Sequence, residues 1–108
     1  MWIFLPNSML SIGEKPSDRG AGTLTVRGRV RGDIEAVFPS AEVTEGDGTD
    51  YRFRATLPRE QVAKAMYDSV MSIGYSNFKA QVKDRARHDV YLRCWTSMYR
   101  LQDEQTNR

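Results

Sequence analysis

Two stretches of the chain alternate between apolar or small residues and arginine or threonine: residues 24–31, LTVRGRVR, and residues 51–57, YRFRATL. Successive side chains of a strand point to opposite faces, so this period of two predicts two strands, each with an apolar and a polar face. If the strands share one sheet, five arginines stand on its open face. These are the candidate binding residues, Arg27, Arg29, Arg31, Arg52 and Arg54.

Further strands are predicted from shorter apolar runs. Residues 2–4 and 9–12 flank the turn-like sequence LPNS and form either two halves of one bent strand or a tight pair. Residues 13–23, GEKPSDRGAGT, have the composition of a solvated connection with a mobile tip. Residues 41–44 are predicted to pair with the second alternating stretch through a turn at residues 46–48.

Apolar residues at helical spacing predict the helices. A short helix is expected around Ile34, Val37 and Phe38, with Asp33 as its cap. A longer helix is expected to open at Pro58 and to stop at Gly74. Its predicted buried stripe consists of Val62, Met66, Val70 and Ile73.

The C-terminal third is also predicted to be helical. Ser76 is the expected cap of a helix over residues 76–84. Tyr91, Trp95 and Met98 form an apolar stripe further along. The pattern leaves open whether residues 76–101 form one helix or two.

Strands arrive in hairpin pairs and helices collect late in the chain, which favours an α+β fold. We expect a two-layer domain, ferredoxin-like or related, with an antiparallel sheet of about four strands. The helices would pack on one face, so the arginines would occupy the other. The expected boundaries are a single domain over residues 1–102 and a flexible tail over residues 103–108.

Bulk composition excludes several classes of protein. The chain is 40% hydrophobic and 28% charged, as in ordinary globular proteins, and it has no apolar run long enough to span a membrane. Its single cysteine, Cys94, rules out an internal disulfide and a multi-cysteine zinc site, and it is expected to be a small buried hydrophobe. A cytoplasmic location and no membrane partner follow as expectations.

The net charge of +2 is too small to argue for nucleic acid by itself, although 12 of the 16 basic residues are arginine. Like charges that face each other across a sheet destabilise it, so the arginine face needs an acidic counterpart. That counterpart is either internal or a binding partner. The internal candidates lie in the neighbouring hairpin and are Glu42, Glu45, Asp47 and Asp50.

Catalytic chemistry has little support in the sequence. His88 is the only histidine, so a metal site has no second imidazole, and we expect Asp89 to cap a helix. A metal-assisted nuclease that uses His88, Asp84 and Asp89 is the weakest alternative, because its ligand set is incomplete. No cofactor or metal is expected, and the chain is interpreted as a protein that is not an enzyme.

Several segments together resemble a family of small uncharacterised bacterial and phage-borne proteins. The segments are WIFxxNSxLSI, LTVRGRVRGDIEAVFP, DYRFRATLPRE, YSNFK and RHDVYLRCW, and the resemblance spans residues 2–101. The chain departs from the family in the GEKPSDRGAGT connection, where the family has a charged turn. The family supplies no activity to transfer, but its phage-like settings imply a small inhibitor or regulator that works by binding.

The sequence therefore predicts a small binding or regulatory protein whose basic sheet face docks an acidic protein partner. A phage-encoded inhibitor of a host defence complex is one concrete version of this hypothesis. The alternative is nucleic-acid binding through the same arginines, against which stands the lack of exposed aromatics on the two strands. Tyr51 falls on the same side as Phe53 and Leu57, which the alternation assigns to the core. Self-association as a homodimer is a further alternative.

Overall fold

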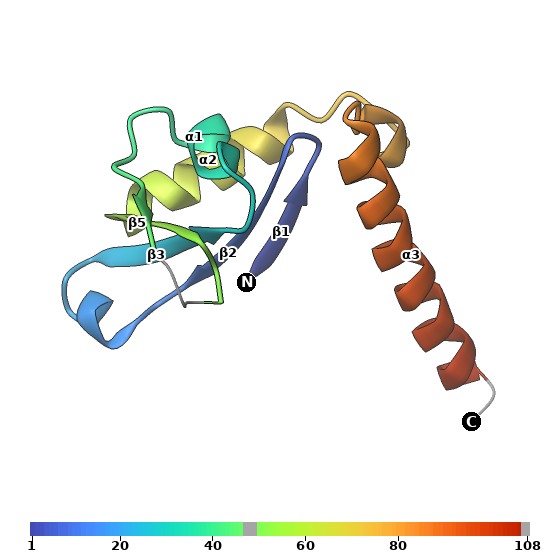
Figure 1. Ribbon diagram of the computed structural model, residues 1–108, viewed down its shortest axis with the longest axis horizontal. Helices are drawn as coiled ribbons and strands as arrows, with labels where there is room; N and C mark the ends of the chain where they lie inside the picture. The colour runs from blue at the N-terminus through green and yellow to red at the C-terminus, as the bar shows by residue number, and fades with distance from the viewer. Residues whose placement is uncertain (47–49, 107–108) are drawn as a thin grey trace. The chain divides into compact units, whose positions relative to one another are not determined.

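The computed structural model describes residues 1–46 and 50–106. Its contacts divide the chain into two compact units, Met1–Gly74 and Tyr75–Arg108, which we call unit 1 and unit 2. Unit 1 contains the sheet and the first two α-helices, and unit 2 contains a third α-helix (Figure 1). That helix continues to Thr106, inside the segment for which the sequence predicts a tail. The boundary of one domain at residue 102 stays a prediction.

Unit 1 is built on a five-stranded antiparallel sheet in the order β1-β2-β3-β5-β4. The strands are β1 Trp2–Leu5, β2 Ser8–Gly13, β3 Thr23–Gly28, β4 Thr44–Glu45 and β5 Phe53–Pro58. The α+β class and the antiparallel sheet are confirmed, but the sheet has five strands where about four were expected. The element order β-β-β-α-β-β-α also differs from the β-α-β-β-α-β order of ferredoxin-like folds.

The fifth strand comes from the N-terminal apolar runs, which form a tight pair and not one bent strand. Trp2 lies opposite Ser11, and Leu5 lies opposite Ser8 across a two-residue turn. Met1 extends this ladder, because its ammonium group donates to the Ile12 carbonyl oxygen at 2.7 Å.

Two helices cover one face of this sheet, as predicted (Figure 1). They are α1 Asp33–Val37 and α2 Arg59–Met71. Gly28 lies against α1, where a Cβ atom would be in van der Waals contact with Ile34 Cγ1 at 3.4 Å. The buried core between the two layers consists of Leu10, Ile12, Val26, Ile34, Phe38, Phe53, Ala55, Leu57 and Val62.

The predicted stripe of α2 is only half correct. Val62 is buried and Met66 packs against the core, but Val70 and Ile73 are 64% and 50% exposed. The helix stops at Met71, and Ile73 follows its last turn. Val70 and Ile73 continue the apolar spacing, but they lie beyond the part of the helix that the sheet of unit 1 covers.

Unit 2 contains a single α-helix, α3 Arg85–Thr106, preceded by the 3-10 turn η2 Lys79–Gln81. The helix predicted over residues 76–84 is therefore wrong beyond that turn. Phe78 stacks on Tyr91 with ring centroids 6.0 Å apart, and Val82 is 5% exposed beside η2. Short contacts between η2 and the start of α3 thus hold this unit together.

Two predictions for α3 are wrong. Asp84, not Asp89, caps the helix, because its Oδ1 accepts the Ala86 backbone N–H at 3.0 Å. Cys94 is exposed where a buried thiol was expected, and Trp95 is 51% exposed. The helix extends well beyond η2, so most of its apolar positions have nothing of unit 2 to pack on. Of the helices in the described residues, none combines the length and the apolar character that a membrane crossing needs.

Candidate anion-binding face

The sheet face opposite α1 and α2 carries a row of cross-strand neighbours. Arg27 on β3 lies directly opposite Arg54 on β5. The row continues through Ser11 and Trp2 on one side and Thr44 on the other. Directly opposed residues of antiparallel strands point to the same face, so these side chains share one surface. We call this surface the open face.

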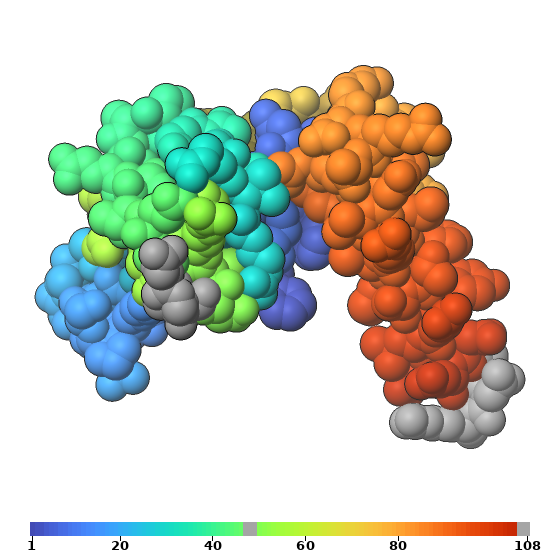
Figure 2. Space-filling view, in the orientation of Figure 1, coloured from blue at the N-terminus to red at the C-terminus, as the bar shows by residue number. Residues whose placement is uncertain are grey.

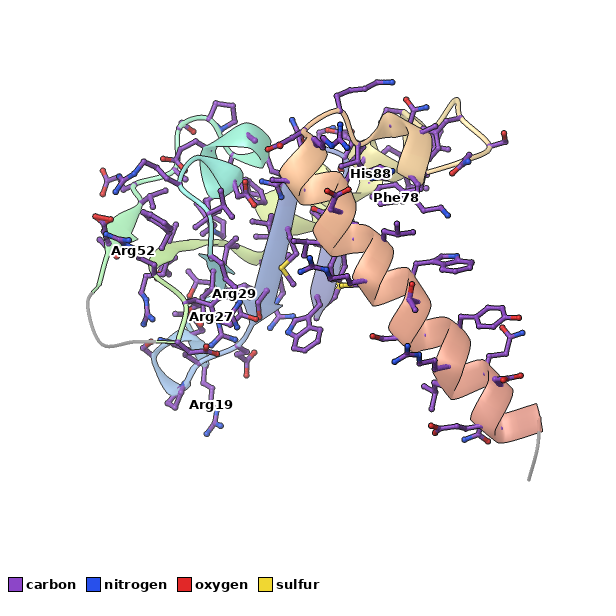
Figure 3. All side chains as sticks on the ribbon, turned by 45° about the vertical axis from the view of Figure 1, so that its right-hand side comes forward. Arg19, Arg27, Arg29, Arg52, Phe78 and His88 are labelled. Atoms are coloured by element: carbon purple, nitrogen blue, oxygen red, sulfur yellow. The ribbon has the colours of Figure 1, made fainter. Side chains whose placement is uncertain are left out.

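Only two of the five candidate arginines lie on strands. Strand β3 ends at Gly28 and β5 begins at Phe53, so Arg29, Arg31 and Arg52 lie beyond the strand ends. Strand register therefore fixes the sheet face of Arg27 and Arg54 alone, and the display of all five arginines on one face stays a prediction. Figure 3 shows Arg27 and Arg29 close together, with Arg52 on a different part of unit 1.

The turn into α1 explains the early end of β3. Gly32 adopts a φ of 92°, which favours glycine, and it redirects the chain toward α1. Asp33 is 3% exposed, and its Oδ2 accepts the Met9 backbone N–H at 3.0 Å. This bond fixes the start of α1 against β2, so the alternation of LTVRGRVR stops before its last three residues.

The three arginines beyond the strand ends are paired with carboxylates. Arg29 Nη1 lies 3.1 Å from Asp50 Oδ1, and this hydrogen bond raises the pKa of the guanidinium above its ordinary value. Glu45 Oε1 bridges Arg31 Nη2 at 2.6 Å and Arg52 Nε at 3.0 Å. The internal acidic counterpart thus exists for these three residues.

The other two members of the acidic set are Glu42 and Asp47. Glu42 forms no ion pair with any residue that the structure describes. Asp47 lies outside the described residues, as do residues 47–48 of the predicted turn.

Tyr51 is a buried residue, and two of the five candidate arginines lie over its ring. It is 5% exposed, and its ring lies 4.1 Å from Arg29 Cζ and 5.1 Å from Arg27 Cζ. Its backbone oxygen accepts from Arg54 Nη2 at 3.2 Å. Tyr51 is buried, as predicted, but it does not belong to the core cluster that contains Phe53, because it precedes β5 and strand alternation does not reach it.

Arg27 and Arg54 remain without a counter-charge. Within residues 1–46 and 50–106 neither forms an ion pair, and both Nε atoms are buried without a hydrogen-bond partner. Arg27 Nη2 reaches only the neutral Ser11 hydroxyl, at 3.3 Å. Like charges at directly opposed positions of a ladder destabilise it, so we expect an anion to bind favourably beside Arg27 and Arg54.

The connection between β2 and β3 holds the residue that sequence reasoning missed. Pro16–Asp18 forms the 3-10 turn η1, and Asp18 is 2% exposed. Its carboxylate accepts from the Thr23 hydroxyl at 2.7 Å, the Lys15 backbone N–H at 2.8 Å and the Thr25 hydroxyl at 2.7 Å. These hydrogen bonds, with that from Thr23 the strongest, hold the pKa of Asp18 below its ordinary value.

Asp18 thereby fixes part of residues 13–23, which the composition predicts to be a solvated connection. Residues around η1, drawn in blue, project as a lobe from unit 1 (Figure 2). The sequence did contain a signal: Pro16 suits the first position of a helical turn, and Asp18 follows two residues later. Its partners Thr23 and Thr25 could not be foreseen, because the turn had to fold back onto β3 first.

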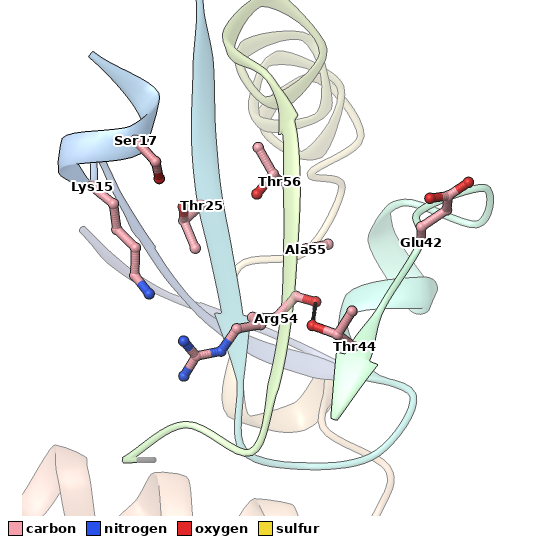
Figure 4. Close-up of a pocket in the computed structure, with 8 residues that line it drawn as sticks. All are labelled: Lys15, Ser17, Thr25, Glu42, Thr44, Arg54, Ala55 and Thr56. Atoms are coloured by element: carbon pink, nitrogen blue, oxygen red, sulfur yellow. Dashed lines mark hydrogen bonds between the residues drawn. The ribbon is translucent and has the colours of Figure 1, made fainter. Parts of the chain in front are cut away.

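A cavity of about 310 Å³ lies between η1 and β5. In Figure 4, Arg54, Thr56 and Thr25 extend on the same side of the strands as Lys15 and Ser17, and Glu42 lies on the other side of β5. The lining residues are Lys15, Ser17, Thr25, Glu42, Thr44, Arg54, Ala55 and Thr56. Arg54 thus lines this cavity and is also, with Arg27, one of the two arginines that form no ion pair among the described residues.

His88 lies beside one carboxylate among the described residues, that of the adjacent Asp89. Its Nδ1 lies 3.4 Å from Asp89 Oδ1, and Figure 3 places His88 on α3 with Phe78 nearby. Among the described residues, no three His, Cys, Asp or Glu side chains gather closely enough to hold a metal ion. Asp84, the third residue of the nuclease hypothesis, instead caps α3.

Comparisons of the chain with family models, with curated proteins and with solved structures find no match. The resemblance to small bacterial and phage-borne proteins therefore stays a prediction, and the site rests on its own geometry.

Proposed function

We propose that this chain is a binding protein without enzymatic activity and that its open face docks an acidic surface of a partner protein. The observation that carries the proposal is the pair Arg27 and Arg54. These side chains face each other across β3 and β5, and no described carboxylate neutralises them.

An aromatic residue strengthens this proposal. Trp2 lies in the same cross-strand row as Arg27 and is 70% exposed. Tryptophan and arginine are enriched among the residues that carry most of the binding energy at protein interfaces. An acidic partner would relieve the repulsion between the two guanidinium groups and would also cover the indole ring.

Trp2 also supports nucleic-acid binding as a second candidate. Sheet-type RNA readers stack bases on exposed aromatics beside basic residues, and Trp2 supplies one such ring. Tyr51 supplies none, because Arg27 and Arg29 cover it. One available ring favours the protein partner over RNA, since RNA-binding sheets commonly stack two or three bases.

The test uses an acidic polypeptide and two nucleic acids as probes. Fluorescence anisotropy would measure binding of labelled poly-L-glutamate, single-stranded RNA and duplex DNA to the full chain at several salt concentrations. We expect poly-L-glutamate to bind, and Arg27→Gln and Arg54→Gln each to weaken binding about tenfold. Arg100→Gln on α3 is the matched control, because it removes the same charge outside the open face.

Arg29 and Arg52 provide an internal comparison. Both already pair with carboxylates, so Arg29→Gln and Arg52→Gln should weaken poly-L-glutamate binding less than the changes at Arg27 and Arg54. Equal binding by Arg54→Gln and the wild type would overturn the proposal. Tighter binding of RNA or DNA than of poly-L-glutamate, with a salt slope of several units, would establish the second candidate instead.

A phage-encoded inhibitor of a host defence complex remains the specific form that the sequence resemblance implies. Capture from a nuclease-treated lysate of the native host, with the Arg54→Gln variant as control, would identify the partner. A partner that both forms retain equally would not be held by the open face.

A further inference from the structure

We propose that the cavity between η1 and β5 binds the phosphate group of a small ligand. This cavity adjoins the open face and shares Arg54 and Thr44 with it, but it would take a small ligand and not a protein surface. The inference therefore goes beyond the proposed function and can fail or succeed by itself.

Two cationic side chains line this cavity from separate elements. Lys15 comes from the segment that leads into η1, and Arg54 comes from β5. Lys15 forms no ion pair with a described residue, and Arg54 Nε is buried without a hydrogen-bond partner. Both side chains extend on the same side of the sheet in Figure 4.

Two hydroxyl groups complete the donor set. Ser17 on η1 and Thr56 on β5 line the same cavity, and the hydroxyl group of neither makes a hydrogen bond within the described residues. Thr25 is not a donor here, because its hydroxyl proton already goes to Asp18. The cavity thus offers an ammonium, a guanidinium and two hydroxyls.

The nearby acidic residues offset only part of this positive character. Asp18 does not line the cavity, although its charged carboxylate attracts the Lys15 ammonium group. Glu42 lines the cavity but lies on the other side of β5 from Lys15, Ser17 and Thr56 (Figure 4). An anion between η1 and β5 would therefore meet the two cations before it met Glu42.

This donor set fits a phosphate group better than a carboxylate. A carboxylate has two oxygens, whereas a phosphate monoester presents three charged oxygens that can accept from several directions. Lys15 and Ser17 approach from η1, and Arg54 and Thr56 from β5, so the donors surround the ligand. The volume of about 310 Å³ also leaves room for a small organic group attached to the phosphate.

The experiment titrates the full chain with inorganic phosphate, with phenyl phosphate and with acetate, and sodium chloride holds the ionic strength constant. Chemical shifts of backbone amides would report binding and locate it. We expect both phosphates to shift the amides of Lys15, Ser17 and Thr56, and acetate to leave them unchanged. Tighter binding of phenyl phosphate would identify the ligand as an ester, and equal binding would identify free phosphate.

Lys15→Gln and Ser17→Ala are the test variants, because both side chains lie on the partly exposed η1 segment. Lys15→Gln should weaken phosphate binding about tenfold or more, and Ser17→Ala should weaken it severalfold. Lys64→Gln is the matched control, since Lys64 pairs with Asp68 on α2, away from the cavity. Circular dichroism would show that each variant keeps its fold.

The proposal is overturned if neither phosphate shifts these amides, or if Lys15→Gln binds phosphate as tightly as Lys64→Gln does. It is also overturned if acetate produces the same shifts as phosphate. Neither result affects the docking proposal, which is measured with poly-L-glutamate and with Arg27→Gln. Conversely, failure of poly-L-glutamate to bind would leave the phosphate site standing.

Discussion

Arg27 and Arg54 are direct cross-strand partners, and each has a buried Nε atom without a hydrogen-bond partner. Their neighbours Arg29, Arg31 and Arg52 all have a carboxylate within 3.1 Å. Five arginines that look alike in the sequence thus divide into a neutralised set and an unneutralised pair. Of these five arginines, only Arg27 and Arg54 lack an ion pair among the described residues, so we expect an external anion to bind to them.

Glu45 neutralises two of the five candidate arginines, Arg31 and Arg52. Glu45→Gln removes the carboxylate that bridges Arg31 and Arg52, and it should tighten poly-L-glutamate binding severalfold. Both ion pairs are largely exposed, so the free energy of unfolding should change by less than about 1 kcal/mol. Glu42→Gln adds the same charge without freeing an arginine. Equal effects of the two variants on binding would show that the bridge does not matter.

Acid should weaken the anchoring of η1. The pKa of Asp18 is lowered from 3.8, chiefly by the Thr23 hydrogen bond, so the folded state binds a proton less readily than the unfolded state does. The stability from Asp18 is therefore complete above pH 3.8 and is lost as the pH falls through the lowered pKa.

The variant Asp18→Asn tests this pH dependence. Its melting temperature should be lower than that of the wild type at neutral pH, and the difference should shrink in the acidic range. Melting curves between pH 2 and pH 7 would measure both effects, with about one pH unit between points. Asp68→Asn, on the exposed surface of α2, serves as the control. Parallel curves for wild type and Asp18→Asn would contradict the assignment.

Val62 and Val70 should respond very differently to the same truncation, although both belong to the predicted stripe of α2. Val62 is 3% exposed, so Val62→Ala should lower the free energy of unfolding by about 1.5–3 kcal/mol. Val70 is 64% exposed, so Val70→Ala should change it by less than about 0.5 kcal/mol. Urea unfolding would compare the two, and equal losses would mean that Val70 is covered in solution.

Phe78 should be important for unit 2. Phe78→Ala removes the stack on Tyr91, which is 7% exposed, and it should cost at least about 1 kcal/mol and reduce the helicity of α3. Tyr99→Ala removes a different stack, on Trp95, in which both rings are about half exposed. Its effect should be smaller. Circular dichroism at increasing temperature would rank the two, and the reverse order would contradict the packing of η2 on α3.

Cys94 should react without unfolding. Its side chain is exposed on α3, so iodoacetamide should label one thiol per chain in native buffer. The rate should be close to that measured in denaturant, because no protecting layer has to open. A labelling rate that rises more than about tenfold on unfolding would show instead that the thiol is covered.

Local patterns in the sequence predicted the layers of unit 1 correctly. The alternation in residues 24–28 and 53–57 placed Val26, Ala55 and Leu57 in the core and Arg27 and Arg54 on the opposite face. Pro58 and the spacing after it located α2, and the spacing of Ile34 and Val37 located α1, although its N-cap is Gly32 and not Asp33 as predicted. These predictions succeeded because burial on one face imposes a period on neighbouring residues.

The pairing within the candidate site could not be predicted in the same way. Whether Arg29 meets Asp50, or Arg31 meets Glu45, depends on where β3 ends, and a contact between Asp33 and Met9 influences that end. Asp18 meets Thr25 only after η1 folds back onto β3. Each of these partners is distant in the sequence or lies across a turn.

The two-residue period was enough to assign residues to the apolar and polar sides of the central strands, because that assignment depends only on neighbouring positions. The fold was needed to show that Arg27 and Arg54 lack a counter-charge among the described residues, that Tyr51 lies beneath Arg27 and Arg29, and that Lys15 joins Arg54 at one cavity. The physical reason is that charge pairing requires two groups within a few ångströms. The register between residues 27 and 54, and the fold of η1 over the sheet, set those distances.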